Sequence, residues 1–112
     1  MNKEILIMLD YDGGPIWNSF PDDLMTGIPQ VDADEALLAL NCRISRKYMS
    51  YYEFDSHDEG CWFNEERQTA EREEMRNLLM QLIDRLNALN DGSFTVVSSY
   101  GLEEQYGIVV GR

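Results

Sequence analysis

The sequence has few of the residues that metal centres, disulfide frameworks and nucleic-acid surfaces require. Its 112 residues include one histidine, two cysteines and nine lysines and arginines, against 21 aspartates and glutamates. The resulting formal charge of −12 disfavours direct binding to nucleic acid and to anionic membranes, because both need clustered Lys and Arg. Two cysteines, Cys42 and Cys61, are too few for a disulfide framework, so we expect free thiols in a cytoplasmic protein.

Long apolar runs are missing as well. No stretch of 18 apolar residues exists, so we expect no membrane-spanning helix. No basic segment followed by an apolar stretch opens the chain, and we expect no signal peptide. With 44% apolar residues, a chain of this length should fold as one domain, residues 1–112, and we expect a monomer.

The few cations are unevenly placed along the chain. From Glu4 to Cys42 there are eight acidic residues and no Lys or Arg, and from Leu86 to Gly111 there are three and again none. Apart from the chain ends, the cations fall in two groups with helical surroundings: Arg43, Arg46 and Lys47, then Arg67, Arg72, Arg76 and Arg85. The uncompensated negative charge therefore belongs to segments outside the expected helices.

The first half of the chain predicts a strand, a long loop and a helix. Residues Glu4 to Leu9 form a short apolar run that is followed by DYDGG, and the short length and the glycines favour a buried strand. A polar loop follows from Asp10 to Val31, and its apolar residues predict that it packs against the domain. Asp32 is the expected N-cap of the first helix, with Glu35 completing a capping box.

The second half predicts a longer helix and a hairpin. Asn64 is the expected N-cap and Gly92 stands just past the end of the helix. The segments 94–99 and 106–110 have the composition of two strands joined by a turn. The expected fold is α+β, with two antiparallel helices packed on a three-stranded sheet in the chain order β-α-α-β-β.

The segment Tyr48 to Glu66 has the most unusual composition. It contains six aromatic residues, six acidic residues and no Lys or Arg. Acidic groups beside rings match a basic partner, because carboxylates pair with its cations and rings supply contact area. The alternative is that the rings belong to the core and the acids form a solvated rim.

Two non-helical segments thus carry rings that alternate with acids, and we take them as the candidate partner-binding surface. Rings such as Tyr and Trp often supply most of the energy of an interface. The candidates in the first segment are Tyr11, Asp12, Trp17, Asp22 and Asp23. Those in the second are Tyr52, Glu53, Asp55, His57, Asp58, Glu59 and Trp62.

An enzymatic alternative rests on the run ILIMLDYDGGPI, which resembles the first motif of the haloacid dehalogenase superfamily. The resemblance implies a small Mg²⁺-dependent phosphohydrolase in which Asp10 attacks phosphorus and Asp12 handles the proton. Ser98 or Ser99, at the end of an apolar run, could supply the second motif. The family's lysine and its downstream acidic pair have no counterpart in this sequence.

The run DSHDEGC places Asp55, His57, Asp58 and Cys61 within seven residues. One His and one nearby Cys are fewer ligands than a structural zinc site uses, and Gly60 disfavours a helix that would bring them together. A Cys–His catalytic pair would also need an oxyanion site and an orienting group. We therefore expect no metal, no cofactor and no catalysis.

The stretches DYDGGPIW and YYEFDSHDEGCWFN, with the following LLMQLIDRLNALNDGSF, are similar to the small immunity proteins of bacterial contact-dependent growth inhibition systems. The resemblance implies a cytoplasmic, non-enzymatic inhibitor that binds one cognate toxin domain, often a basic RNase that cleaves tRNA. The expected partner is therefore a basic toxin domain, bound one to one. An acidic nucleic-acid mimic that inhibits another nuclease is the alternative.

Overall fold

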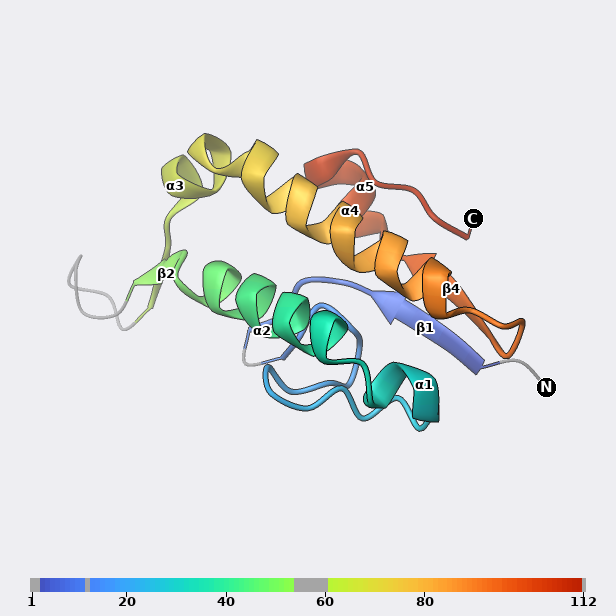
Figure 1. Ribbon diagram of the computed structural model, residues 1–112. Coiled ribbons are helices and arrows are strands. Elements are labelled where there is room, and N and C mark those ends of the chain that lie inside the picture. The colour runs from blue at the N-terminus through green and yellow to red at the C-terminus, as the bar shows by residue number, and fades with distance from the viewer. Residues whose placement is uncertain (1–2, 12, 54–60, 112) are drawn as a thin grey trace.

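The computed structural model describes residues 3–11, 13–53 and 61–111, and it has the α+β class that the sequence predicts (Figure 1). The strands are β1 (Lys3–Ile7), β2 (Tyr52–Glu53), β3 (Trp62–Phe63) and β4 (Phe94–Ser98). The helices are α1 (Pro29–Asp32), α2 (Glu35–Met49), α3 (Glu65–Ala70), α4 (Arg72–Leu89) and α5 (Tyr100–Tyr106). The arrangement of these elements differs from the predicted one.

The strands β1 and β4 form a two-stranded parallel sheet, in which Ile5 lies opposite Val96. Buried and more exposed residues alternate along both strands, so one face of the sheet joins the core. Helices α2 and α4 pack against each other and run in opposite directions, as expected (Figure 1). The apolar face of α4, including Leu79 and Leu82, lies in the same core as the strand residues.

The prediction of a hairpin at the C-terminus is wrong. Tyr100–Tyr106 forms α5, because the Ser99 side chain caps its first turn and Gly107 ends it with a φ of 68°. The segment after α5 returns to β4, where the Ser98 backbone N–H donates to Val110 O at 2.9 Å. The expected three-stranded sheet, with its C-terminal hairpin, is thus replaced by a parallel pair with a short segment beside β4.

The first long helix begins later than predicted. Asp34, not Asp32, is the N-cap of α2, and its carboxylate accepts a hydrogen bond from Leu37 N at 2.9 Å. The same carboxylate binds Arg85 of α4 at 2.8 Å. Asp32 instead lies in α1 and accepts hydrogen bonds from the backbone N–H and the hydroxyl of Thr26, at 2.9 and 2.6 Å.

The predicted second helix is two helices. Asn64 is the N-cap, as expected, but α3 and α4 are separated at Glu71, whose φ and ψ are −101° and 11°. Gly92 lies past the end of α4, as predicted, with a φ of 94°. Within the described residues, no helix combines the length and the apolar character needed to cross a bilayer.

Replacement of Asp34 separates the contribution of the cap from that of the ion pair. Asp34→Ala removes both, and we expect a loss of about 0.5–2 kcal/mol in the free energy of unfolding at pH 7. Asp34→Asn keeps the cap and should lose less. Glu35→Ala, an exposed residue one position on, is the control and should change stability by less than about 0.5 kcal/mol.

The ion pair should also make this contribution depend on pH. The hydrogen bond from Arg85 holds the pKa of Asp34 below its ordinary value of 3.8. A lowered folded-state pKa gives stability that is present above the unfolded pKa and lost as pH falls through the folded one. Urea unfolding should show the gap between wild type and Asp34→Asn shrinking below about pH 4. A gap unchanged at low pH would contradict the ion pair.

Candidate partner-binding surface

Five rings from three separate segments meet in one aromatic cluster, which consists of Tyr11, Tyr48, Tyr51, Tyr52 and Phe63. The ring centroids of Tyr52 lie 4.9 Å from Tyr11, 5.0 Å from Phe63 and 5.6 Å from Tyr48. These are ordinary separations for tilted and edge-to-face aromatic pairs. The cluster joins the first loop to the end of α2 and to the segment before α3. In the sequence, the rings of the loop and those near residues 48–66 were two separate stretches with no sign that they meet.

A short hairpin, which the sequence analysis did not predict, presents part of this cluster. In the antiparallel pair β2–β3, Tyr52 lies opposite Phe63 and Glu53 opposite Trp62. Since successive strand residues point to opposite faces, Tyr52 and Phe63 share the cluster face, and Glu53 and Trp62 share the other. Figure 1 places the hairpin at the end of the molecule away from both chain termini.

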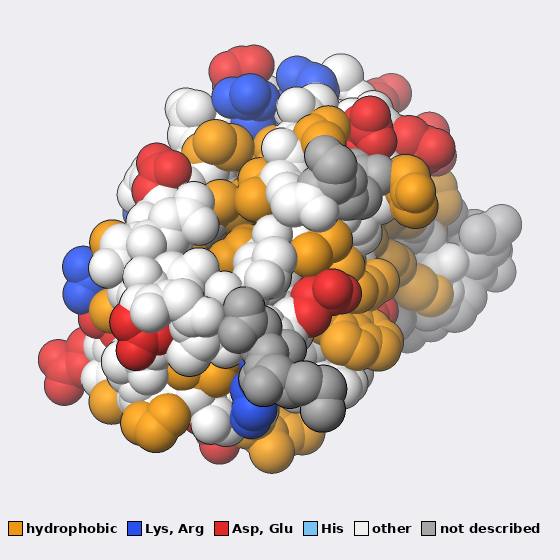
Figure 2. Space-filling model, turned by 90° about the vertical axis from the view of Figure 1, so that its right-hand side faces the viewer, with side chains coloured by type: hydrophobic (Ala, Val, Ile, Leu, Met, Phe, Trp, Pro, Cys, Tyr) orange, Lys and Arg blue, Asp and Glu red, His pale blue; other side chains and the backbone are white. Residues whose placement is uncertain are grey.

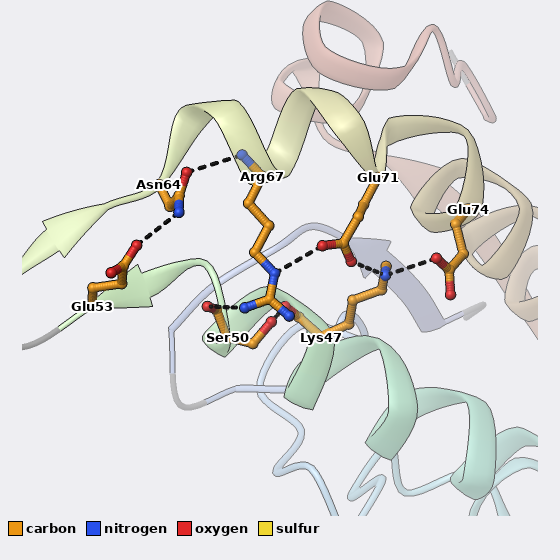
Figure 3. A network of polar contacts seen from close by, with 7 residues as sticks. All are labelled: Lys47, Ser50, Glu53, Asn64, Arg67, Glu71 and Glu74. Carbon is orange, nitrogen blue, oxygen red and sulfur yellow. Dashed lines mark hydrogen bonds and ion pairs between the residues drawn. The ribbon is translucent and has the colours of Figure 1, made fainter.

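A network of charged and polar side chains holds the hairpin and the helices together (Figure 3). Lys47, near the end of α2, binds the carboxylates of Glu71 and Glu74, the latter at 3.2 Å. Glu71 also binds Arg67 of α3 at 2.8 Å, and Arg67 donates to Ser50 O at 3.2 Å. The break between α3 and α4 therefore lies where Glu71 meets both cations.

The hairpin is tied to this network through the cap of α3. Asn64 accepts a hydrogen bond from Arg67 N at 2.9 Å and donates one to Glu53 at 2.7 Å (Figure 3). The Asn64 backbone N–H also donates to Tyr51 O at 2.6 Å. Asn64 thus holds the start of α3 against both β2 and Tyr51, next to the aromatic cluster.

The electrostatics of the network keep its members charged. Hydrogen bonds from Lys47 and then Arg67 lower the pKa of Glu71. Burial alone would lower the pKa of Lys47, but its contacts with Glu71 and Glu74 outweigh burial and raise it. Both groups are therefore ionised at neutral pH, and the positive charge of this network is already matched by carboxylates of the same chain.

Two tyrosines of the cluster are held in the neutral form by burial. Burial raises the pKa of Tyr48 and of Tyr51 above the ordinary value for a tyrosine. The hydroxyls of Tyr48 and Tyr52 lie 3.3 Å apart. The hydroxyl of Tyr51 is buried and has no hydrogen-bond partner among the described residues. The cluster thus offers ring faces and hydroxyl groups.

The first loop is held against α2 by a buried asparagine. The Asn41 amide donates to Phe20 O at 2.9 Å, and its oxygen accepts from Ile16 N at 3.4 Å. Ser45, one turn further along α2, donates to Gly13 O at 2.8 Å. A Cβ at Gly14 would lie 2.3 Å from the Asn41 amide nitrogen, so only glycine fits there. The loop packs down as predicted.

Although its backbone is fixed, this loop leaves large apolar side chains in solvent. Tyr11 is 40% exposed, Trp17 48% and Phe20 55%. These three rings and Asp10 line a hollow of about 260 Å³, which we call the loop hollow. Because Tyr11 also contacts Tyr52, the loop hollow and the aromatic cluster form one continuous surface.

The sequence candidates are distributed unequally over this surface. Tyr11, Trp17, Tyr52, Glu53 and Trp62 all belong to the cluster, the hairpin or the loop hollow. Asp22 and Asp23 are exposed in a turn closed by hydrogen bonds between Phe20 and Asp23, and neither lines the loop hollow. The candidates Asp12, Asp55, His57, Asp58 and Glu59 lie outside the described residues.

Sequence reasoning missed three rings that contribute to this surface. Tyr48 opens the unusual segment 48–66 but is not among the sequence candidates, although its ring contacts that of Tyr52. Phe63 precedes the cap of α3 and gave no separate signal. Phe20 was expected to pack inward with the rest of the loop, but it is 55% exposed.

The structure also locates the groups of the enzymatic alternative. Parallel pairing of β1 and β4 brings the segments that follow them to the same edge of the sheet. Both candidate hydroxyls have structural partners there: Ser98 Oγ accepts from Val110 N at 2.8 Å, and Ser99 caps α5. Among the described residues, no three His, Cys, Asp or Glu side chains converge as metal ligands.

The two cysteines are free thiols in the structure. Cys42 is half-buried on α2, and Cys61 is exposed just before β3. The expectation of two unpaired cysteines is thus in agreement with the structure.

Apolar exposure alone does not single out the candidate surface. Figure 2 views the end of the molecule where the chain termini lie, and apolar side chains are visible across the middle of that face too. Val109, near the C-terminus, is 50% exposed. The candidate surface differs from that end in combining tilted and edge-to-face ring pairs with a stretch of sequence, residues 48–66, that has carboxylates and no cation.

No protein-family model, no curated protein and no solved structure matches this chain. The functional argument therefore rests on the geometry and the charges of the chain itself.

Proposed function

We propose that this protein is an immunity protein: a non-enzymatic cytoplasmic inhibitor that binds a cognate basic toxin domain, an RNase, one to one. The observation that carries the proposal is the aromatic cluster at the β2–β3 hairpin, within a stretch of sequence, residues 48–66, that has six acidic residues and no Lys or Arg. Exposed rings supply contact area at low entropic cost, and uncompensated carboxylates select a basic partner. The resemblance to immunity proteins of contact-dependent growth inhibition systems points to the same partner.

The charge distribution supports a basic partner in particular. Lys47 and Arg67, the cations nearest the hairpin, are already paired with Glu71. The first loop has no cation of its own between Glu4 and Cys42. The remaining carboxylates of the surface can therefore pair with cations of a partner. The RNA-binding cleft of a nuclease carries such cations, because it binds phosphates.

The direct test uses the gene immediately upstream. Its C-terminal domain is expressed in a laboratory host, with and without this protein, and growth and tRNA integrity are followed. We expect growth arrest with RNA cleavage, relieved by co-expression. A domain that is harmless, or whose toxicity this protein does not relieve, would overturn the proposal. Mg²⁺-dependent phosphoester hydrolysis by the purified protein, lost in Asp10→Asn, would favour the phosphohydrolase instead.

Association with the toxin domain should be fast and sensitive to salt. With a formal charge of −12, long-range attraction raises the association rate, and salt at physiological strength screens it over about 8 Å. Stopped-flow mixing should show the association rate constant falling at least about tenfold between low and high NaCl, with a smaller change in the dissociation rate. A rate independent of salt would contradict the electrostatic basis of the proposed surface.

A further inference from the structure

The loop hollow has the composition of a site for a cationic side chain. Its lining includes three exposed rings, Tyr11, Trp17 and Phe20, and one exposed carboxylate, Asp10. Among the residues that the structure describes, no Lys or Arg contributes to the lining. Ring faces carry negative electrostatic potential and attract cations within about 6 Å, and a neighbouring carboxylate adds to that attraction.

The backbone that carries these groups is fixed before any partner binds. Asn41 and Ser45 of α2 hydrogen-bond three residues of the loop, Ser19, Phe20 and Gly13, and Gly14 packs directly on Asn41. Asn18, which lies in the hollow next to Trp17, has a φ of 67°, a conformation that residues other than glycine adopt rarely. A fixed site has less entropy to lose when it is occupied.

The charge of the occupant follows from the charge of the loop. Eight acidic residues and no cation lie between Glu4 and Cys42, and Lys3, whose Nζ donates to Thr26 O of the loop at 3.3 Å, does not line the loop hollow. The described lining of the hollow thus has a carboxylate and three rings but no cation. A basic side chain of a partner would complement this arrangement. A planar guanidinium fits better than an ammonium, because it stacks on rings, pairs with a carboxylate through two N–H groups and is less strongly hydrated.

We propose that the loop hollow receives an arginine side chain of the partner protein, with the guanidinium against the rings of Tyr11 and Trp17 and paired with Asp10. The identity of that partner as a toxin domain rests on the proposed function. The preference of the hollow for a guanidinium does not, and it can be measured without the toxin.

The test titrates N-acetyl-arginine amide into ¹⁵N-labelled protein, with N-acetyl-citrulline amide as the uncharged analogue of nearly the same shape. The indole N–H signals of Trp17 and Trp62 are assigned from Trp17→Phe and Trp62→Phe. We expect a saturable shift at Trp17 with arginine and at least about tenfold weaker binding of citrulline. Equal responses to the two compounds would overturn the proposal.

A charge-matched pair of variants tests the role of Asp10. Asp10→Asn should weaken arginine binding by about three- to tenfold, since it removes the pairing carboxylate. Asp84→Asn, on the exposed side of α4, changes the net charge equally and should leave binding as in wild type. Equal weakening by both variants would show a general charge effect and overturn the assignment of the site.

Toxin binding by Trp17→Ala and Asp10→Asn separates this inference from the proposed function. If wild type neutralises the toxin and both variants bind it as tightly, the hollow is not part of the interface, and the immunity role stands. If the arginine titration succeeds but no toxin is neutralised, the guanidinium site stands and the proposed function fails. We expect both variants to bind the toxin at least about tenfold more weakly.

Discussion

Alanine in place of Trp62 is expected to weaken toxin binding by roughly five- to a thousandfold, which corresponds to about 1–4 kcal/mol. Trp62 lies in β3 opposite Glu53, on the face of the hairpin that points away from the aromatic cluster. Its half-buried ring is the largest side chain among the described residues of the hairpin, and in the sequence Trp62 follows the acidic segment 54–60 after one residue, Cys61. Isothermal titration calorimetry with the toxin domain measures the loss.

The same replacement should leave the fold nearly unchanged. A half-buried ring on a two-residue strand contributes little to the core, so we expect the free energy of unfolding to fall by about 1 kcal/mol or less. Val109→Ala is the control, because Val109 is 50% exposed and belongs to the C-terminal segment after α5, and Figure 1 places the C-terminus at the end of the molecule away from the hairpin. If Val109→Ala abolishes protection and Trp62→Ala does not, the interface lies at the terminal end and the hairpin rings are core and rim.

Replacement of Asn41 by leucine should cost about 2–4 kcal/mol in the free energy of unfolding. Asn41 is fully buried on α2 and hydrogen-bonds both Ile16 N and Phe20 O. Leucine has a similar volume but leaves these two backbone groups without their partner, at about 1–3 kcal/mol for each buried group. Urea unfolding measures the loss, and toxin binding should weaken with it, since the loop that carries Trp17 is no longer held.

An asparagine elsewhere provides the control for this change. Asn87 is exposed on α4, and Asn87→Leu should change stability by less than about 0.5 kcal/mol. A loss below 1 kcal/mol in Asn41→Leu would mean that the loop finds other partners for its backbone. In that case the loop hollow is less rigid than its hydrogen bonds indicate, and the proposed arginine site is not fixed before the partner binds.

Several residues of the candidate surface could be predicted from the sequence, but the contacts that bring them together could not. The rings and acids of the two segments, and the lack of cations among them, are evident in the chain itself. That Tyr11 and Tyr52 contact each other depends on folding, because 40 residues separate them in the chain. Asn41 gave no signal either, since an asparagine within a helix is usually solvent-exposed.

The sequence by itself determined the charge, the α+β class, the two long helices and the cap at Asn64. These depend on composition, on the spacing of apolar residues and on hydrogen bonds between near neighbours, all of which are local. Only the tertiary structure decided that β4 pairs in parallel with β1 and that Asp34 is the cap of α2, since these depend on partners far away in the chain, β1 for β4 and Arg85 for Asp34. Helix α5 has local caps, Ser99 and Gly107, but the strand-like composition of the segments around it concealed them in the sequence. Contacts between distant segments are chosen by burial and by satisfaction of backbone groups in the whole domain, which no local pattern encodes.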